Sequence, residues 1–396
     1  MLLVSAAAGA ADWPDWRGPE RDGLSRETGL LAKWPPGGPP LAWTASGLGS
    51  GFSSLSTSNG LVFTQGQRDG KQYLIALDEA TGRKRWEVAH GSAYGNNRGD
   101  GPRGTPTVDG DRVYALAADG SLICVNAATG ERLWSTNLLQ RFGGSNIRWG
   151  LSETPLVDGD RLIVNAGGRG ASIVALDKNN GNVLWKSQSD EAGYSSAVVS
   201  EVEGLRQYVV LTGEAAVGVS TENGELFWRY DRVSNRTANI ATPIVEGNHV
   251  FVSSDYGTGC ALLRLSRQGN RIKADEVYFN RDMRNHYSSS VLLGDYLYGF
   301  SSSILTAMKF ATGEVAWRDR SVGKGQVIFA DGRLYLFGEG GVAGMAEATP
   351  AGYREISRFE IPRVSSLPTW ALPAIARGNL YLRDQGSLYC YNIRGR

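Results

Sequence analysis

One phrase recurs along this chain: a short apolar run, an Asp or Asn, a few linker residues, a Gly and, four residues later, a Trp. Clear copies read LIALDEATGRKRW (74–86), LICVNAATGERLW (122–134), IVALDKNNGNVLW (173–185), VGVSTENGELFW (217–228) and LTAMKFATGEVAW (305–317). With two weaker echoes around Gly269 and Gly352, the successive glycines lie 39 to 51 residues apart. A repeat of that length indicates one supersecondary unit used many times.

A second phrase precedes the first in each unit, and it has the pattern of a tight hairpin. Examples are TPTVDGDRVYAL (105–116), TPLVDGDRLIV (154–164) and TPIVEGNHVFV (242–252). Asp-Gly or Glu-Gly between alternating apolar residues favours a hairpin, because Gly accepts the positive φ that such turns require. Two hairpins per unit make a four-stranded meander, which is the blade of a β-propeller.

The number of blades follows from the first-hairpin glycines, which occur at positions 60, 110, 159, 204, 247, 294, 332 and 378. The last unit stops after its third strand, GSLYCYN (386–392), and LAWTA (41–45) can supply the missing fourth strand. The sequence therefore predicts an all-β fold, a single eight-bladed β-propeller of four-stranded antiparallel blades closed by N-terminal strand exchange. The repeated tryptophans are interpreted as packing between blades, not as cofactor stackers: Trp43, Trp86, Trp134, Trp185, Trp228 and Trp317.

Three segments are predicted: a signal segment (1–11), an N-terminal extension (12–40) and the propeller (41–396). The first segment is apolar and ends in small residues, so a periplasmic or secreted protein is expected, without a nearby cysteine for a lipid anchor. A deletion ending at Trp13 is expected to be harmless. The net charge of +1 gives no reason to expect nucleic-acid binding, and no apolar window is long enough to span a bilayer. With three scattered cysteines and three distant histidines, no metal is expected, and the chain is expected to be a monomer.

The repeated phrase and the strand-exchange closure resemble the pyrroloquinoline-quinone-like β-propeller repeat family from Leu41 to Asn392. This family includes the quinoprotein alcohol dehydrogenases, the outer-membrane assembly lipoprotein of the barrel-insertion machinery, and exported propellers of unknown role. The leader DWPDWRGPERDGLSRETGLLAKWP (12–35) resembles that of the third set. The resemblance implies the fold more specifically than it implies a function.

The quinoprotein branch implies pyrroloquinoline quinone (PQQ) held between a Trp and a disulfide of adjacent cysteines, a calcium ion and an Asp base. This chain has no adjacent cysteine pair, and its VDGD phrases (108–111 and 157–160) are explained by hairpin turns. A PQQ- and calcium-dependent dehydrogenase therefore stays as the alternative. The predicted function is an exported, non-catalytic binding or scaffold propeller without a cofactor, for which no catalytic residue is identified.

Binding residues are predicted on the loops that join one blade to the next, because these loops gather around one mouth of the channel. Two of them are long (89–104 and 135–153). The residues predicted to bind a polar ligand are Arg98, Asp100, Arg103, Arg148, Trp149, Glu153, Tyr194, Asn239, His286, Tyr287 and Trp370. Aromatic rings beside Arg, Asn and carboxylates suit a sugar or a peptide, or a protein partner docked at the mouth.

A simpler interpretation of the same residues stays open. They could satisfy one another and cap the channel, for example through Arg148–Glu153 or Arg103–Asp100 salt bridges. His286, or Asp100 with Glu153, could also act as acid and base if their pKa values were shifted, although no spacing identifies a nucleophile.

Overall fold

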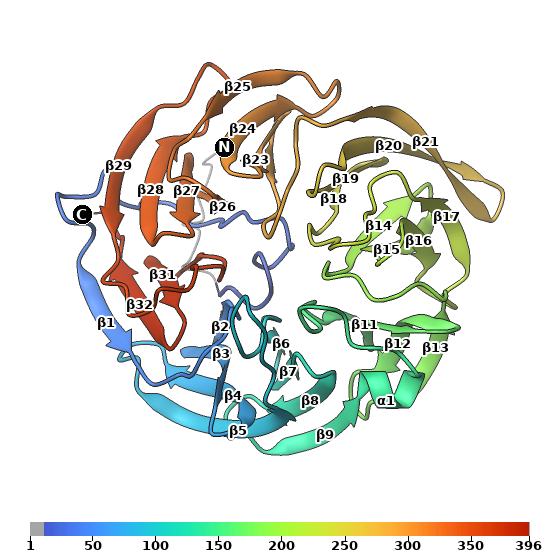
Figure 1. Ribbon diagram of the computed structural model, residues 1–396, viewed down its shortest axis with the longest axis horizontal. Helices are drawn as coiled ribbons and strands as arrows, with labels where there is room; N and C mark the ends of the chain where they lie inside the picture. The colour runs from blue at the N-terminus through green and yellow to red at the C-terminus, as the bar shows by residue number, and fades with distance from the viewer. Residues whose placement is uncertain (1–11, 396) are drawn as a thin grey trace, which may run out of the picture.

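The computed structural model describes residues 12–395, whose strands form eight four-stranded sheets around a central channel (Figure 1). Strands that are consecutive in a blade pair antiparallel, and the described residues contain one short helix, α1 (Leu138–Phe142). The predicted eight-bladed all-β propeller is confirmed. The predicted signal segment, residues 1–11, lies outside the described residues. Between residues 12 and 395 there is no helix with the length and apolarity needed to cross a membrane.

The first four blades follow one another in chain order, each from its innermost strand outward. Blade 1 consists of β2 (Leu55–Ser58), β3 (Leu61–Arg68), β4 (Lys71–Asp78) and β5 (Lys84–Ser92). Blade 2 consists of β6 (Thr107–Asp109), β7 (Arg112–Leu116), β8 (Ser121–Asn126) and β9 (Arg132–Asn137). Blade 3 consists of β10 (Leu156–Asp158), β11 (Arg161–Gly168), β12 (Ala171–Asp177) and β13 (Val183–Ser187). Blade 4 consists of β14 (Val198–Val202), β15 (Leu205–Leu211), β16 (Ala216–Ser220) and β17 (Leu226–Tyr230).

The next three blades repeat this order, and the eighth combines both ends of the chain. Blade 5 consists of β18 (Ile244–Glu246), β19 (His249–Ser254), β20 (Gly259–Gln268) and β21 (Arg271–Asn280). Blade 6 consists of β22 (Val291–Leu293), β23 (Tyr296–Ser301), β24 (Ile304–Lys309) and β25 (Val315–Asp319). Blade 7 consists of β26 (Gly325–Ala330), β27 (Arg333–Gly338), β28 (Val342–Glu347) and β29 (Glu355–Glu360). Blade 8 consists of β30 (Ala374–Ala376), β31 (Asn379–Asp384), β32 (Ser387–Asn392) and β1 (Leu41–Ala45).

The ring closes as predicted, because β1 pairs antiparallel with β32 and becomes the outermost strand of blade 8. In the register of this pair, Trp43 faces Cys390 and Ala45 faces Leu388. An outer edge of β32 left unpaired would expose backbone donors and acceptors to other chains. The exchanged strand covers that edge.

The repeated Gly and Trp are explained by the contact between neighbouring blades. A Cβ on Gly82 of blade 1 would lie 2.5 Å from the Trp43 ring of blade 8, and one on Gly130 of blade 2 would lie 2.8 Å from the Trp86 ring of blade 1. The rings of Trp43, Trp86, Trp134 and Trp185 each sit in this way on the bare glycine of the next blade. The indole N–H donates to that blade as well, from Trp43 to the Glu79 carbonyl at 2.9 Å. The same indole-to-carbonyl bond is made by Trp86, Trp134, Trp185 and Trp317.

Trp228 departs from this pattern. Its indole N–H donates to the side chain of Gln207 in its own blade at 2.7 Å, and the glycine of the next repeat, Gly269, has no neighbour in contact range of an added Cβ. Blade 5 has Tyr278 where other blades have Trp, and the Tyr278 hydroxyl donates to the Phe310 carbonyl of blade 6 at 2.9 Å. The weak copy of the sequence phrase around Gly269 thus corresponds to altered contacts on both sides of blade 5.

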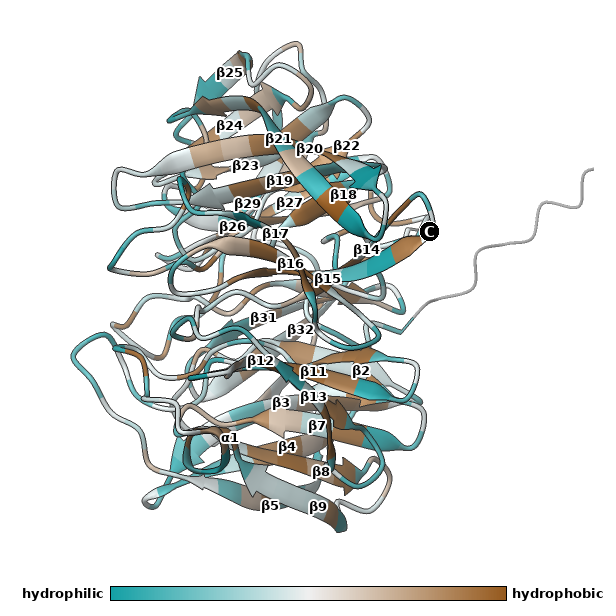
Figure 2. Cartoon of the chain, turned by 90° about the vertical axis from the view of Figure 1, so that its right-hand side faces the viewer, coloured by the Kyte–Doolittle hydropathy of each residue, from teal (hydrophilic) through white to brown (hydrophobic). Residues whose placement is uncertain are grey.

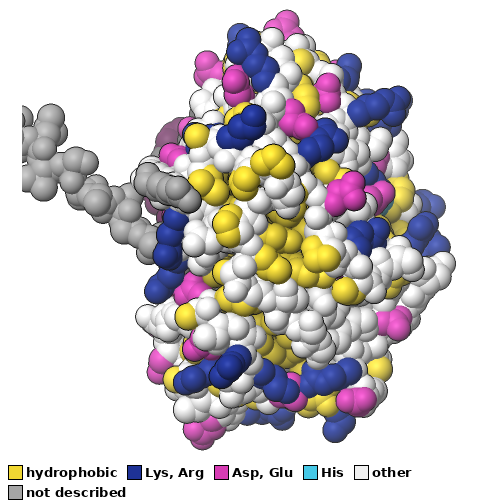
Figure 3. Space-filling model, turned by 90° about the vertical axis from the view of Figure 1, so that its left-hand side faces the viewer, with side chains coloured by type: hydrophobic (Ala, Val, Ile, Leu, Met, Phe, Trp, Pro, Cys, Tyr) yellow, Lys and Arg dark blue, Asp and Glu magenta, His cyan; other side chains and the backbone are white. Residues whose placement is uncertain are grey.

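The core consists of clusters between adjacent blades. One of them packs Leu156 and Trp185 of blade 3 against Tyr208 and Val217 of blade 4. Hydrophobic residues follow the strands, while many connecting segments are hydrophilic (Figure 2). On the side of the ring formed by blades 7 and 8, hydrophobic side chains gather in the middle, and charges of both signs are interspersed around them (Figure 3).

The N-terminal extension crosses the centre of the ring (Figure 1). Its residues 12–31, here called the strap, hydrogen-bond to all eight blades. Their partners, from blade 1 to blade 8, are Thr57, Val108, Thr154, Ala197, Thr242, Ser290, Phe329 and Gly378. The strap is therefore part of the propeller and lies across its channel.

Trp13 shows how firmly the strap is built in. Its side chain is 1 % exposed and packs with Trp43 and Leu55, and its backbone exchanges two hydrogen bonds with Thr57. A deletion ending at Trp13 removes a fully buried indole, so we expect it to destabilise the fold, contrary to the expectation from the sequence.

Candidate functional site

A cavity of about 560 Å³ opens where the loops between blades lead into the inner strands. We call it the funnel. Its lining combines loop residues of several blades with Trp16 of the strap, which closes it from the channel side. The lining residues are Trp16, Phe52, Arg98, Arg103, Trp149, Ser152, Thr154, Tyr194, Ser196, Ile240, Thr242, Tyr256, His286, Tyr287, Ser289, Lys324, Glu339, Gly340, Ser366, Pro368 and Trp370.

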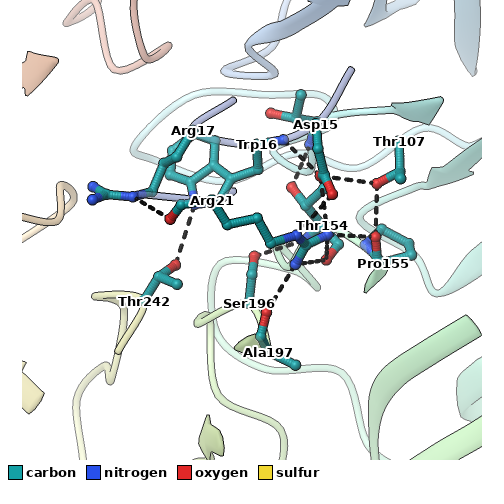
Figure 4. Close-up of polar contacts among 11 residues, drawn as sticks. Asp15, Trp16, Arg17, Arg21, Thr107, Thr154, Pro155, Ser196, Ala197 and Thr242 are labelled. Carbon is teal, nitrogen blue, oxygen red and sulfur yellow. Dashed lines mark hydrogen bonds and ion pairs between the residues drawn. The ribbon is translucent and has the colours of Figure 1, made fainter. Parts of the chain in front are cut away.

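Beneath the funnel, the strap is held by a buried ion pair (Figure 4). Arg21 is 5 % exposed, and its Nε donates to Asp15 Oδ2 at 2.7 Å. The same guanidinium donates to the carbonyls of Thr154, Pro155 and Ala197. The Trp16 indole N–H donates to Thr242 Oγ1 at 3.2 Å, which fixes the ring under the cavity. The floor of the funnel is thus anchored by charge-assisted bonds.

Aromatic side chains follow one another around the funnel in a belt. The Trp149 and Tyr256 rings are nearly parallel, with their centroids 6.4 Å apart, and the Tyr287 and Trp370 centroids are 5.4 Å apart. His286 links the two pairs, with its centroid 5.2 Å from that of Tyr256. The aromatic belt comprises Phe52, Trp149, Tyr194, Tyr256, His286, Tyr287 and Trp370. Such a lining presents flat, apolar ring faces to a ligand.

Three cations share the funnel with one carboxylate. The Arg103 guanidinium lies over the rings of Phe52 and Tyr94, at 5.4 and 5.0 Å, and the Lys324 ammonium lies 5.6 Å from the Tyr287 centroid. Within residues 12–395, neither Lys324 nor Arg98 has an ion-pair partner. Glu339 accepts a hydrogen bond from the Trp370 indole at 3.1 Å. The funnel therefore carries an excess of positive charge.

Two polar atoms in the belt have no hydrogen-bond partner within the described chain: His286 Nδ1 and the Tyr287 hydroxyl. Burial, and then the nearby charge of Lys324, lower the pKa of His286 to about 4, so its ring is neutral at pH 7. Burial also raises the pKa of Tyr287 well above its usual value, so its hydroxyl keeps the proton. Both groups can hydrogen-bond to a ligand without a charge of their own.

Of the residues predicted from the sequence, seven line the funnel. They are Arg98, Arg103, Trp149, Tyr194, His286, Tyr287 and Trp370. Their loops lie far apart in the chain and converge because each leads to an inner strand at the same end of the ring.

The other four predicted residues lie outside the lining. Asp100 accepts from the backbone N–H of Asn96 within its own loop, and Asn239 is buried and donates to the carbonyls of Thr212 and Gly213. Arg148 is exposed, with its guanidinium 5.1 Å from the Trp149 ring. Each of these three side chains therefore contacts other residues of the protein and does not line the funnel.

Glu153 is the fourth, and it is 2 % exposed. Its carboxyl group accepts from the backbone N–H of Asn165 inside the blade. Burial raises the pKa of Glu153 to about 8, against smaller opposing effects of that hydrogen bond and of Arg21. The side chain is therefore mostly protonated at pH 7 and faces the protein interior.

The channel-capping alternative predicted two salt bridges, Arg148–Glu153 and Arg103–Asp100. Neither is among the ion pairs of residues 12–395. Arg103 instead donates to the carbonyls of Gly99 and Gly101. The loops do contact each other through the Tyr94 hydroxyl, which donates to the Arg148 carbonyl at 2.9 Å.

Sequence reasoning missed Trp16, Phe52, Tyr256, Lys324 and Glu339 of the lining. Tyr256 and Glu339 lie on turns within blades, between the second and third strands. Trp16 lies on the strap, where the dense DWPDWRGPERDG segment (12–23) is the available signal. Two Trp, two Arg and three Asp in twelve residues are unusual for a simple linker.

Three comparisons with known proteins agree on the fold. The outer membrane protein assembly factor BamB of Burkholderia pseudomallei is 29 % identical over 250 residues, covering 59 % of this chain and 61 % of that protein, so the chain spans about three fifths of this relative. The crystal structure of BamB from Moraxella catarrhalis has a TM-score of 0.64 at 14 % identity, covering 92 % of this chain and 100 % of that one. A quinohemoprotein alcohol dehydrogenase from Comamonas testosteroni has a TM-score of 0.68 at 12 % identity, covering 99 % of this chain and 82 % of that one.

The resemblance drawn from the repeats is confirmed at the level of the family. A family model described as outer membrane protein assembly factor BamB matches residues 40–319, which contain the closing strand β1 and all strands of the first six blades. Because this match covers well over half of the sequence, the protein belongs to the BamB family of PQQ-like β-propellers.

Proposed function

We propose that this protein is an exported, non-catalytic binding propeller that holds a polar ligand, a sugar or a short peptide, in the funnel. One observation carries the proposal: the aromatic belt encloses a cavity of about 560 Å³ at the open end of the channel. A concave site of that volume, lined by rings with a few polar groups, is typical of small-ligand binding.

The polar atoms inside the belt support the same proposal. His286 Nδ1 and the Tyr287 hydroxyl are buried without a partner in the chain, and a buried polar atom left unpaired costs about 1–3 kcal/mol. A network that merely capped the channel would have satisfied these atoms. A ligand carrying hydroxyl or amide groups can pair with them.

The lining does not fit the quinoprotein alternative. Glu339 is the single carboxylate of the funnel, whereas calcium takes six to eight oxygen ligands, several of them from carboxylates. The part of the chain from residue 12 to residue 395 holds no group of three or more His, Cys, Asp or Glu able to bind a metal ion. The cysteines Cys124, Cys260 and Cys390 are unpaired and lie in three different blades. We therefore derive no redox step.

A second candidate, a scaffold that docks a protein partner, is supported by the family to which the chain belongs. The family model and several relatives are named as outer membrane protein assembly factors. In that case the loops around the funnel serve as a docking face. Export to the periplasm or beyond is part of both candidates and rests on the apolar segment 1–11.

Binding to a glycan and peptide array, followed by titration of each hit, tests the proposal. Trp149→Ala and Trp370→Ala each remove a ring of the belt, and each should weaken binding by about ten- to a hundredfold. Trp134→Ala removes a tryptophan of the outer rim and is the matched control, with unchanged affinity at a temperature where it is folded. Hits whose affinity is insensitive to both belt variants would overturn the funnel as the binding site. Absence of hits would favour the scaffold.

A further inference from the structure

The floor of the funnel repeats one chemical feature from blade to blade. A Ser or Thr stands two residues before the inner strand in six of the eight blades, as Ser53, Thr105, Thr154, Ser196, Thr242 and Ser289. At this position the chain turns from the loop into the channel. Four of these residues line the funnel, and we call them the hydroxyl ring: Thr154, Ser196, Thr242 and Ser289.

Each oxygen of the hydroxyl ring accepts an N–H hydrogen bond. The backbone N–H of Thr154 donates to Ser196 Oγ, and that of Thr242 donates to Ser289 Oγ, both at 2.9 Å. Thr154 Oγ1 accepts from the backbone N–H of Thr105 at 3.2 Å. Thr242 Oγ1 accepts from the Trp16 indole N–H, also at 3.2 Å (Figure 4). These bonds run between blades or from the strap, so they fix the oxygens in place.

The hydroxyl protons remain available. A Ser or Thr hydroxyl has one proton to donate, and across residues 12–395 no group accepts a hydrogen bond from any of these four hydroxyls. A hydroxyl that already accepts a hydrogen bond is polarised toward donating one. The floor of the funnel therefore presents four donors whose natural complement is an acceptor-rich group.

The charges that line the funnel favour an anion. Arg98, Arg103 and Lys324 line the funnel against Glu339, which is engaged by the Trp370 indole. Asp255 lies just outside the lining, and its carboxylate accepts from the Ser302 hydroxyl. Charge-assisted hydrogen bonds from such donors to a carboxylate or sulfate are about twice as strong as neutral ones.

We propose that the funnel binds an anionic saccharide, whose carboxylate or sulfate lies on the hydroxyl ring and whose pyranose faces pack against the aromatic belt. This inference rests on the proposed function and adds the charge and class of the ligand. A sugar is favoured over an acidic peptide because the lining offers flat rings with few aliphatic contacts, Ile240 and Pro368. Pyranose C–H faces match flat rings, whereas the short carboxylate side chains of an acidic peptide offer no comparable flat apolar face.

The test is isothermal titration of the whole chain with two matched pairs: trigalacturonate against its methyl ester, and a sulfated against an unsulfated galactan tetrasaccharide. Pentaglutamate represents the peptide class. At least one anionic sugar should bind at least about tenfold more tightly than its neutral partner. Raising the salt concentration should weaken binding of the anionic member alone.

The ratio of the two affinities is the readout, since general damage to the fold does not change it. Arg98→Gln alters an exposed side chain and Ser196→Ala a member of the hydroxyl ring, and both should reduce the ratio severalfold. Lys186→Gln, on the exposed face of β13, is the charge control and should leave it unchanged.

Each other outcome counts against the inference in a distinct way. Equal affinity for both members of a pair overturns the anion while leaving the proposed function intact. Tighter binding of pentaglutamate than of any sugar overturns the saccharide. No binding of any of these probes up to millimolar concentration overturns the inference as a whole, and the array then decides whether another ligand uses the funnel.

Discussion

Basic side chains occur at both ends of the channel, but the protein supplies their partners more fully at the strap end than at the funnel end. At the strap end, Arg21 is buried with Asp15 and three backbone carbonyls, and Arg17 donates to the carbonyls of Asp22 and Ser290. At the funnel end, Arg98 and Lys324 have no carboxylate partner in residues 12–395. A buried cation needs a carboxylate or carbonyl partner, because an isolated buried ion costs several kcal/mol. At the funnel, an anionic ligand would supply the partner that Arg98 and Lys324 lack in residues 12–395.

The largest effect on stability is expected from removal of the strap. A chain that begins at Leu41 keeps the closing strand β1 but loses residues that hydrogen-bond to all eight blades, together with the buried Trp13 and Trp34. Against a chain that begins at Asp12, its melting temperature should fall by more than about 10 °C, because several buried groups lose their partners at once. Differential scanning calorimetry of both chains measures the shift, and equal melting temperatures would show that the strap is not structural.

A matched pair of arginines tests the two ends directly. Arg21→Ala leaves Asp15 and three carbonyls without their donors, and should lower the free energy of unfolding by about 3–5 kcal/mol. Arg98→Ala removes an exposed side chain that makes no ion pair within the described range, and should change it by less than about 0.5 kcal/mol. Urea denaturation of both variants compares them. Similar losses would contradict the difference between the ends.

We expect the stability of the fold to depend on pH through Glu153. Burial raises its pKa from 4.5 to about 8, so the folded state holds a proton that the unfolded chain releases. This contribution is fully present below pH 4.5 and is lost as the pH rises through about 8, at up to about 1.4 kcal/mol per pH unit. Glu153→Gln should flatten this dependence and be more stable than the wild type at pH 8. A variant that follows the wild-type profile would exclude Glu153 as its source.

The smallest expected effect on stability concerns the funnel itself. Trp149→Ala acts on a half-exposed ring of the belt and should change the free energy of unfolding by less than about 1 kcal/mol. Trp134→Ala breaks the contact with Gly181 of the next blade and the bond to the Lys178 carbonyl, and should cost about 2–3 kcal/mol. Should Trp149→Ala prove the more destabilising change, the belt would be a structural cap.

The fold could be predicted because its signals are local and repeated. A Gly that must be bare to receive a Trp, and a turn that needs positive φ, leave the same mark in several blades: Gly82 has φ 68° and Gly130 has φ 76°. The strap could not be predicted in this way. It occurs once, and its bonds are long-range, such as that from Arg21 to Thr154, 133 residues away.

The candidate site was predicted in part for a related reason. Topology brings the loops before the inner strands together, so Trp149, His286 and Trp370 meet although they lie far apart in the chain. Which way a side chain turns within a loop depends on local carbonyls and turns that composition does not reveal. Asp100 therefore bonds within its own loop, and Glu153 turns into the blade.

The central claim is that the open end of the channel is a ligand site closed from below by the strap. A crystal structure with the tightest array ligand bound tests it most directly. We expect ligand density inside the funnel, in contact with the Trp149 and Trp370 rings and within hydrogen-bonding distance of the hydroxyl ring above Trp16. Density on the outer rim of the blades, with the funnel rings untouched, would contradict it.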